Sequence, residues 1–373
     1  MNPETFTDPC LKSHFQGHTE CITQIRFNPK GDKIASSSLD TTVIVWNLKD
    51  TARCISHSAH GERVYGISWS PKSNLLASCG HNCCVKIWEP KAHGVIEEFI
   101  AHGKPVRSVD FHPAGTMVVT GSDDKSNWVR SAKFSPNGKF VASCGDDKSL
   151  RIFDVNTRSC ICTFTDELDM GRQLAWHPYR NIVAVALSCN RVKMFDLSSQ
   201  ELIQLYKAHK ASVNDVAFHP NGNFMLTGSD DETMKILDIR EGRPIYTLTC
   251  RIGRVMSVDF NYDGSSLACA GSDNQMLVWK SNLDNYDCPQ TITIHQSLKQ
   301  KQLLAIPIID SRHCTAFKDR KNNFCKLDCV YTIPKTDSSC TRSSSAKSKF
   351  TSTRNRTTST SDILSRRKAF TMK

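Results

Sequence analysis

The 373-residue sequence has no long hydrophobic segment. No window approaches the roughly 18 consecutive apolar residues that a membrane-spanning helix needs. The first residues, MNPETFTDPCLK, lack the basic and apolar regions of a secretion signal. These absences predict a cytoplasmic protein without a membrane span. The 17 cysteines are scattered through predicted strands and are odd in number, so we interpret them as reduced, mostly buried side chains.

Motifs of enzyme chemistry are missing as well. The sequence has no glycine-rich phosphate loop before a helix and no nucleophile elbow. Cys325 and Cys329 lack a second pair at the spacing of a zinc site. We therefore expect a non-enzymatic protein with no catalytic residue, no metal, no cofactor and no small-molecule substrate.

A repeat of 42 residues organises most of the chain instead. Its clearest markers are the residues that close each unit, namely Trp46, Trp88, Phe153, Phe195, Leu237 and Trp279. A spacing of 42 separates the first pair and every pair from Phe153 onward. Short alternating or β-branched runs are separated by turns rich in proline, asparagine and glycine, which leaves no room for a helix. Each repeat is predicted to supply about four strands of an all-β fold.

The repeats resemble those of WD40 proteins, because the period, the Gly-His opening, the Ser-x-Asp turn and the closing tryptophan occur in the family's order. The resemblance implies a β-propeller whose blades are arranged radially. It also implies a hydrogen-bonded set of His, Ser or Thr, Asp and Trp within each blade. Only the first repeat carries all four, which we assign to His18, Ser38, Asp40 and Trp46. We interpret this tetrad as structural rather than catalytic.

The propeller is predicted to cover residues 1–284, with repeats near 11–52, 53–94, 95–126, 127–159, 160–201, 202–243 and 244–284. The register breaks where Phe111 and Phe134, both at ends of innermost strands, are only 23 residues apart. We interpret this as seven-bladed ancestry with one blade truncated, at about residues 106–126, to its two inner strands.

The first predicted strand has no inner strands of its own. The segment from Leu11 to Phe15 lies one period before the outer strand of the first repeat. We predict that it completes the last blade beside residues 276–279 and so joins the two ends of the propeller.

A basic tail, residues 285–373, follows the repeats and is predicted to be mostly disordered. Its last part, residues 337–373, is rich in Ser, Thr, Lys and Arg and poor in large apolar side chains. About ten of the net +11 charges lie beyond residue 284. A tail that contacts an anionic surface and a merely solvated tail are both compatible with this composition.

The second position of each innermost strand offers a candidate partner-binding rim. It carries Tyr65, Arg107, Arg130 and Arg172 in four successive units. Arginine forms bidentate contacts with carboxylates, so this rim would suit an acidic partner. The alternative is that the arginines pair with Asp123 and Asp146 on neighbouring turns.

Longer segments resemble the centriolar WD-repeat family called proteome of centriole one. The resemblance is carried by HFQGH (14–18), SVNDVAFHPNGN (212–223), MKILDIREGRPIYTL (234–248) and GSDNQMLVWKSNLD (271–284). It implies a scaffold of centrioles and basal bodies that supports centriole stability or assembly and the formation of a cilium or flagellum. Its implied partners are centriolar proteins and possibly tubulin or the microtubule wall. Its implied location is the cytoplasm and cytoskeleton, at the centrosome, centriole and cilium basal body.

Two other functions stay open. Asp238-Ile239-Arg240 resembles the D-x-R part of the box found in substrate receptors of cullin-RING ubiquitin ligases. The basic tail is compatible with a nuclear or RNA-processing WD40 scaffold.

Overall fold

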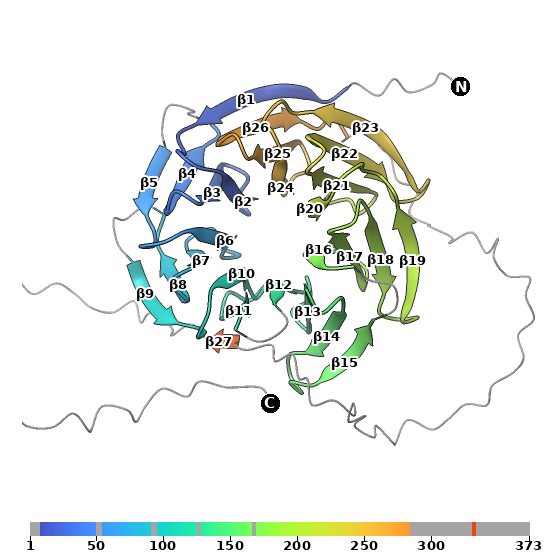
Figure 1. Ribbon diagram of the computed structural model, residues 1–373, viewed down its shortest axis with the longest axis horizontal. Helices are drawn as coiled ribbons and strands as arrows, with labels where there is room; N and C mark the ends of the chain where they lie inside the picture. The colour runs from blue at the N-terminus through green and yellow to red at the C-terminus, as the bar shows by residue number, and fades with distance from the viewer. Residues whose placement is uncertain are drawn as a thin grey trace, which may run out of the picture.

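A ring of β-sheets forms the folded part of the chain (Figure 1). The computed structural model describes residues 8–49, 54–90, 95–124, 128–165, 169–283 and 330–332. Within these ranges there are strands and turns but no helix. Six sheets have four strands each, and one has two strands of its own plus a short strand from the tail. The all-β propeller prediction is confirmed.

We number the blades by the order of their innermost strands. Blade 1 contains β2 (Ile22–Phe27), β3 (Lys33–Ser38), β4 (Thr42–Asn47) and β5 (Cys54–Ser58), and blade 2 contains β6 (Val64–Trp69), β7 (Leu76–Gly80), β8 (Cys84–Trp88) and β9 (Val95–Ile100). Blade 3 contains β10 (Val106–Phe111), β11 (Met117–Ser122) and β27 (Val330–Thr332), and blade 4 contains β12 (Val129–Phe134), β13 (Phe140–Gly145), β14 (Leu150–Asp154) and β15 (Cys160–Phe164). Blade 5 contains β16 (Gly171–Trp176), β17 (Ile182–Leu187), β18 (Val192–Asp196) and β19 (Glu201–Tyr206), and blade 6 contains β20 (Val213–Phe218), β21 (Phe224–Ser229), β22 (Thr233–Asp238) and β23 (Arg243–Thr249). Blade 7 contains β24 (Val255–Phe260), β25 (Ser266–Gly271), β26 (Gln275–Lys280) and β1 (Cys10–Gln16).

The truncated blade lies where the repeat register predicts it. β10 and β11 form an antiparallel pair, and the next strand along the chain, β12, is the innermost strand of blade 4. One feature differs from expectation, because Val330–Thr332 of the tail forms β27 against the outer side of β11. The rest of the tail, which we expected to be disordered, lies outside the described residues.

Closure of the ring uses the first strand, as predicted. β1 pairs antiparallel with β26 from Cys10↔Lys280 to Gln16↔Gln275. Phe15 on this strand is 3% exposed and lies 5.3 Å, between ring centroids, from Trp46 of blade 1. β1 therefore completes blade 7 and also contacts the blade on its other side.

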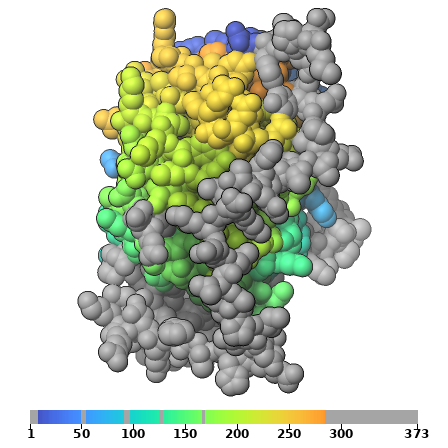
Figure 2. Space-filling model, turned by 90° about the vertical axis from the view of Figure 1, so that its right-hand side faces the viewer, coloured from blue at the N-terminus to red at the C-terminus, as the bar shows by residue number. Residues whose placement is uncertain are grey.

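The core consists of apolar clusters between neighbouring blades. Val43 and Val45 on β4, for example, pack with Ile67 and Trp69 of blade 2. The outer strands are mostly exposed or half-buried and form the side wall of the ring, whose surface Figure 2 shows with chain colours from yellow in its upper part to green below. Apolar side chains from adjacent blades thus seal each interface without a single central core.

Blade 3 keeps both of its interfaces despite the missing strands. Val118 on β11 joins the cluster with Val85 and Ile87 of blade 2, whereas the next residue, Val119, joins the cluster with Phe134 and Phe153 of blade 4. Successive residues of a strand point to opposite faces. Two strands are therefore enough to bridge the neighbouring blades.

A tight turn between the second and third strands recurs around the ring. Its second residue adopts a positive φ, with 71° at Thr41, 64° at Cys83 and 62° at Glu232. The preceding Asp or Asn supports the turn; Asp40 Oδ1, for instance, accepts a hydrogen bond from the Thr42 N–H at 2.9 Å. This turn places an acidic or amide side chain at the same point of each such blade.

Candidate interaction surfaces of the propeller

The hydrogen-bonded set of blade 1 links β3 and β4 to the segment between β1 and β2. His18 Nδ1 donates to Asp40 Oδ2 at 2.8 Å, and its Nε2 accepts from the Ser36 hydroxyl at 2.7 Å. The same Ser36 oxygen accepts from the indole N–H of Trp46 at 2.8 Å. His18 and Ser36 are buried, so the chain of donors and acceptors satisfies polar groups that would be costly to bury alone.

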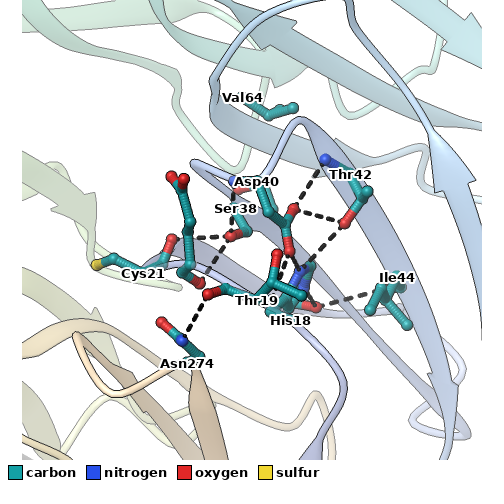
Figure 3. A network of polar contacts seen from close by, with 12 residues as sticks. His18, Thr19, Cys21, Ser38, Asp40, Thr42, Ile44, Val64 and Asn274 are labelled. Atoms are coloured by element: carbon teal, nitrogen blue, oxygen red, sulfur yellow. Dashed lines mark hydrogen bonds and ion pairs between the residues drawn. The ribbon is translucent and has the colours of Figure 1, made fainter.

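The serine expected in this set, Ser38, is not part of it. Its hydroxyl donates to the carbonyl oxygens of Glu20 and Cys21 at 2.9 and 3.0 Å, where the chain enters β2 (Figure 3). Ser36 and Ser38 share one face of β3 because they are two residues apart. Only Ser36 lies at the depth that the Trp46 and His18 rings reach, so the assignment of Ser38 was wrong.

The histidine part of this arrangement, without the indole contact, recurs in three other blades at equal spacing. The histidine bonds a hydroxyl 18 residues later and an acidic or amide side chain 22 residues later: His60 with Ser78 and Asn82, His102 with Thr120 and Asp124, and His209 with Thr227 and Asp231. The set is therefore more widespread than the Ser38 register suggests. It persists even in the truncated blade.

Burial shapes the charges within these sets. Desolvation lowers the pKa of His60 to about 4, because its neighbour Asn82 supplies no negative charge. Desolvation also lowers the pKa of His18, outweighing attraction to Asp40. Burial opposes the ionisation of Asp231, but hydrogen bonds from Thr233 and the Lys210 N–H, with the nearby His209, hold its pKa at about 2. A neutral imidazole that accepts a hydrogen bond from a hydroxyl fits a structural role rather than proton transfer.

The blade 1 set is also tied to blade 7. Asn274, in the turn before β26, donates from its side-chain amide to the Thr19 carbonyl at 2.9 Å (Figure 3). The Thr19 N–H in turn donates to Asp40 Oδ2 at 3.0 Å. The set thereby supports ring closure as well as its own blade.

The rim predicted from the repeat forms a stack on the face where the innermost strands begin, here called the upper face. The Arg107 guanidinium lies 4.2 Å from the Tyr65 ring centroid and 5.6 Å from that of Trp128. Arg130 lies 5.2 Å from the Trp128 centroid. Trp128, which is 38% exposed, immediately follows the break in the repeat. We call Tyr65, Arg107, Trp128 and Arg130 the arginine–aromatic stack.

Both arginines of the stack have carboxylate partners within their own blades. Arg107 Nη2 lies 2.7 Å from Asp123 Oδ2, and Arg130 contacts both oxygens of Asp146 at 2.6 and 3.0 Å. The alternative of paired arginines is confirmed for these two residues. Arg172 lies on β16, one blade further on, and the residue 16 positions after it is Ser188 rather than an aspartate.

Charged side chains also face the central channel, at the fifth position of several innermost strands. Arg26 Nη1 lies 3.3 Å from Asp215 Oδ2, which also accepts from the Ser257 hydroxyl at 2.6 Å. Asp259 accepts from the Phe27 N–H at 2.8 Å, and Asp110 accepts from the Phe134 N–H at 3.0 Å. Each carboxylate therefore links its own blade to at least one other blade.

Enclosure in the channel changes the ionisation of these groups. Desolvation lowers the pKa of Lys133 to about 8, and the positive charge of Arg26 acts in the same direction. Desolvation raises the pKa of Asp259 to about 6, although Arg26 opposes the shift. These channel charges were not predicted from the sequence. The available signal was the recurrence of a charged residue at the fifth position of several innermost strands.

A cavity of about 500 Å³ opens below the channel charges, on the face where the innermost strands end. Its rim contains Pro29, Pro71, Pro113, Pro136 and Pro178 with Trp69, Trp176 and Tyr262. We call it the lower mouth. An apolar rim over a charged floor suits contact with a partner's side chains.

The D-x-R segment has a structural role. Asp238 is buried, and its carboxylate accepts from the Arg240 and Glu241 N–H groups at 2.7 and 3.1 Å. It therefore stabilises the turn between β22 and β23. This geometry gives no specific support to ubiquitin-ligase recruitment.

Comparison with known families agrees with the sheet topology. The model described as WD domain, G-beta repeat, matches residues 9–47, 52–89, 94–127 and 125–154. A second, described as the anaphase-promoting complex subunit 4 WD40 domain, matches residues 174–263. Together they cover more than half of the chain. The chain therefore contains WD40 repeats. The third and fourth matches of the WD40 repeat overlap at 125–127, between the end of β11 and the start of β12 in the sequence.

Shorter segments of the WD40 chain are similar to centriolar proteins. Identity is 60% over 50 residues to the POC1 centriolar protein homolog of Drosophila melanogaster, covering 13% of each chain. It is 48% over 46 residues to the POC1 centriolar protein homolog A of Danio rerio, covering 12% of this chain and 11% of the relative. The matches thus span about an eighth of the relatives' length.

The described part of the chain offers neither a metal site nor a membrane-spanning helix. Within the described ranges, His, Cys, Asp and Glu side chains do not gather into a group of three or more suited to a metal ion. The described part of the WD40 chain also contains no helix able to cross a membrane.

Proposed function

We propose that this WD40 chain is a non-enzymatic protein-binding scaffold of the centriole. The observation that carries the proposal is the 60% identity over 50 residues to a POC1 centriolar protein homolog. The propeller supports it physically, because blades with buried, satisfied polar sets make a rigid ring that presents loops and rims to partners.

The finer role follows the sequence resemblance. The chain would support centriole stability or assembly and the formation of a cilium or flagellum, at the basal body and on the cytoskeleton. Its contacts would be with centriolar proteins and with the microtubule wall. The basic tail suits the second contact, because a chain segment with about ten net positive charges is attracted to an anionic surface.

The upper face is our candidate for the protein contact. Tyrosine, tryptophan and arginine are enriched among residues that dominate binding energy, and the arginine–aromatic stack brings them together. Its aspartate partners hold Arg107 and Arg130 in fixed orientations. Arg172 lacks an aspartate at the equivalent position and so offers its guanidinium to an acidic partner.

Imaging a tagged full-length chain together with a centriole marker tests the location. We expect foci that coincide with the marker. Diffuse nuclear signal without such foci would overturn the proposal in favour of a nuclear scaffold, and co-purification of a cullin would favour the ubiquitin-ligase alternative.

The upper-face contact has a matched pair of variants within blade 5. Arg172→Glu reverses the charge on the upper face, whereas Arg180→Glu makes the same change at an exposed residue beyond the other end of β16. We expect centriolar foci to weaken only with Arg172→Glu. Equal foci in both variants would remove the upper-face assignment but leave the location untouched.

Pelleting with microtubules tests the tail. We expect the full-length chain to sediment with microtubules at low salt and to be released as salt screens the charges. Deletion of residues 285–373 should abolish the binding, and undiminished pelleting of the deleted form would contradict the proposal.

A further inference from the structure

The truncated blade leaves a strand edge that complete blades do not have. In blade 6, the second strand β21 pairs with the third strand over five residues, from Phe224↔Asp238 to Gly228↔Met234. In blade 3 the equivalent strand β11 ends at Ser122, and only Asp123 and Asp124 of the following residues are described before the chain reappears at Trp128 beside blade 4. Among the described residues, no segment between β11 and β12 takes the third place.

Backbone direction identifies which groups face that edge. The His112 N–H donates to the Met117 carbonyl at 2.9 Å, as the His219 N–H does to the Phe224 carbonyl at the same point of blade 6. Met117 therefore turns its backbone groups toward β10. Since these groups alternate along an antiparallel strand, those of Val118 and Thr120 point to the outer side. Unpaired groups on such an edge favour pairing with another strand.

A tail segment already lies against this edge. β27 pairs antiparallel with β11 through Met117↔Thr332, Val118↔Tyr331 and Val119↔Val330, and Figure 1 shows it outside β11. Valine, tyrosine and threonine all favour strands. The 45 residues from 285 to 329 can span up to about 150 Å when extended. The chain is thus long enough to reach blade 3 from blade 7.

We propose that the outer edge of β11 is a docking site for one extended strand, and that its occupant is Val330–Thr332 of the same molecule. The register covers Met117 to Val119 and leaves the backbone groups of Thr120 beyond the paired segment. The site thus anchors the basic tail to blade 3. This assignment is independent of the centriolar proposal, because it depends only on strand pairing.

Amide hydrogen exchange on the full-length chain tests the site with an internal control. Tyr331→Pro removes the N–H that faces Val118 in the register, because proline has no backbone donor. We expect exchange at the Val118 amide to accelerate roughly tenfold or more, since its partner strand is lost. The Val119 amide, which faces β10, should keep its wild-type rate and show that blade 3 remains folded.

Two further variants separate strand pairing from other effects of the substitution. Tyr331→Val keeps the backbone donor and a strand-favouring side chain, so Val118 should exchange at nearly the wild-type rate. Thr336→Pro introduces proline outside β27 and should also leave Val118 protected. A Val118 rate that is the same in wild type and Tyr331→Pro would overturn the proposal.

Dilution distinguishes the tail of the same molecule from that of a second copy. Protection of Val118 should be independent of protein concentration over about a hundredfold range, because an intramolecular contact does not follow mass action. Protection that falls on dilution, with a matching dimer in light scattering, would show an exchanged strand instead and overturn the assignment to the same chain.

Discussion

Blades 3 and 7 both end in a strand from a distant part of the chain, yet the two strands are unequal. β1 has seven residues, pairs along β26 and buries Phe15 against the neighbouring blade. β27 has three residues and pairs with half of β11. β1 leads directly into the His18 set of blade 1, whereas β27 joins a blade whose two inner strands already contact both neighbours.

The difference shows which strands the ring depends on. The inner strands of each blade contribute contacts between blades, including carboxylates on the innermost strands that accept N–H groups of the next blade. An outer strand matters for closure only when it joins two ends of the chain, as β1 does. Loss of the outer half of blade 3 is therefore compatible with a closed ring.

The largest expected effect comes from removing β1, and removal of the tail with β27 serves as the comparison. Deleting residues 1–16 should lower the melting temperature by about 10 °C or more, because several kcal/mol of burial and pairing are lost. Deleting residues 285–373 should lower it by less than about 3 °C. Thermal melts followed by circular dichroism measure both, and equal shifts would break the comparison.

A single side chain should account for much of the first effect. Phe15→Ala is expected to cost about 3–5 kcal/mol, since a buried aromatic leaves a cavity beside Trp46. The control is Leu11→Ala on the same strand, where the side chain is 52% exposed and the cost should be under about 1 kcal/mol. Denaturant unfolding gives both values. Similar costs would mean that β1 acts through backbone pairing alone.

Smaller effects should distinguish the polar set of blade 1 from that of blade 3. Ser36→Ala leaves both the His18 Nε2 and the Trp46 N–H without their partner and should cost about 1–3 kcal/mol. Thr120→Val removes one partner, that of His102, and should cost less. Ser38→Ala reports on the contact with Glu20 and Cys21 instead. If Ser38→Ala also frees the Trp46 N–H in NMR spectra, the set has been assigned to the wrong hydroxyl.

The smallest expected effect is acid sensitivity at blade 2, beside the truncated blade. The pKa of His60 is about 4 in the folded state and about 6.5 when unfolded, so the unfolded chain binds the proton first as the pH falls. His60 should therefore cost about 1–2 kcal/mol of stability between pH 7 and pH 5. His60→Gln removes this contribution, and its stability should fall less steeply over that range. Parallel pH profiles for both proteins would contradict the shift.

Periodicity made the ring predictable. A spacing of 42 and the closing aromatic residues defined the strands, and the shortened interval from Phe111 to Phe134 located the truncated blade. The first strand had no inner strands of its own, so its pairing with the last blade followed from closure. These features depend on local patterns that sequence displays directly.

Other features depend on depth and on distant contacts. Ser36 and Ser38 occupy the same face of β3, and only the reach of Trp46 decides between them. The channel pair of Arg26 and Asp215 joins two blades whose residues are 189 positions apart in the sequence. The pairing of β27 had no repeat to reveal it, because Val330–Thr332 lies outside the period.

The charges in the channel have a consequence for how many partners the ring can hold. Arg26, Asp110, Lys133 and Asp259 lie between the upper face and the lower mouth. The arginine–aromatic stack and the proline rim therefore share no residue. Under the proposed scaffold role, a protein bound at one end of the axis would leave the other end available, so that one molecule would join two different partners along a single line.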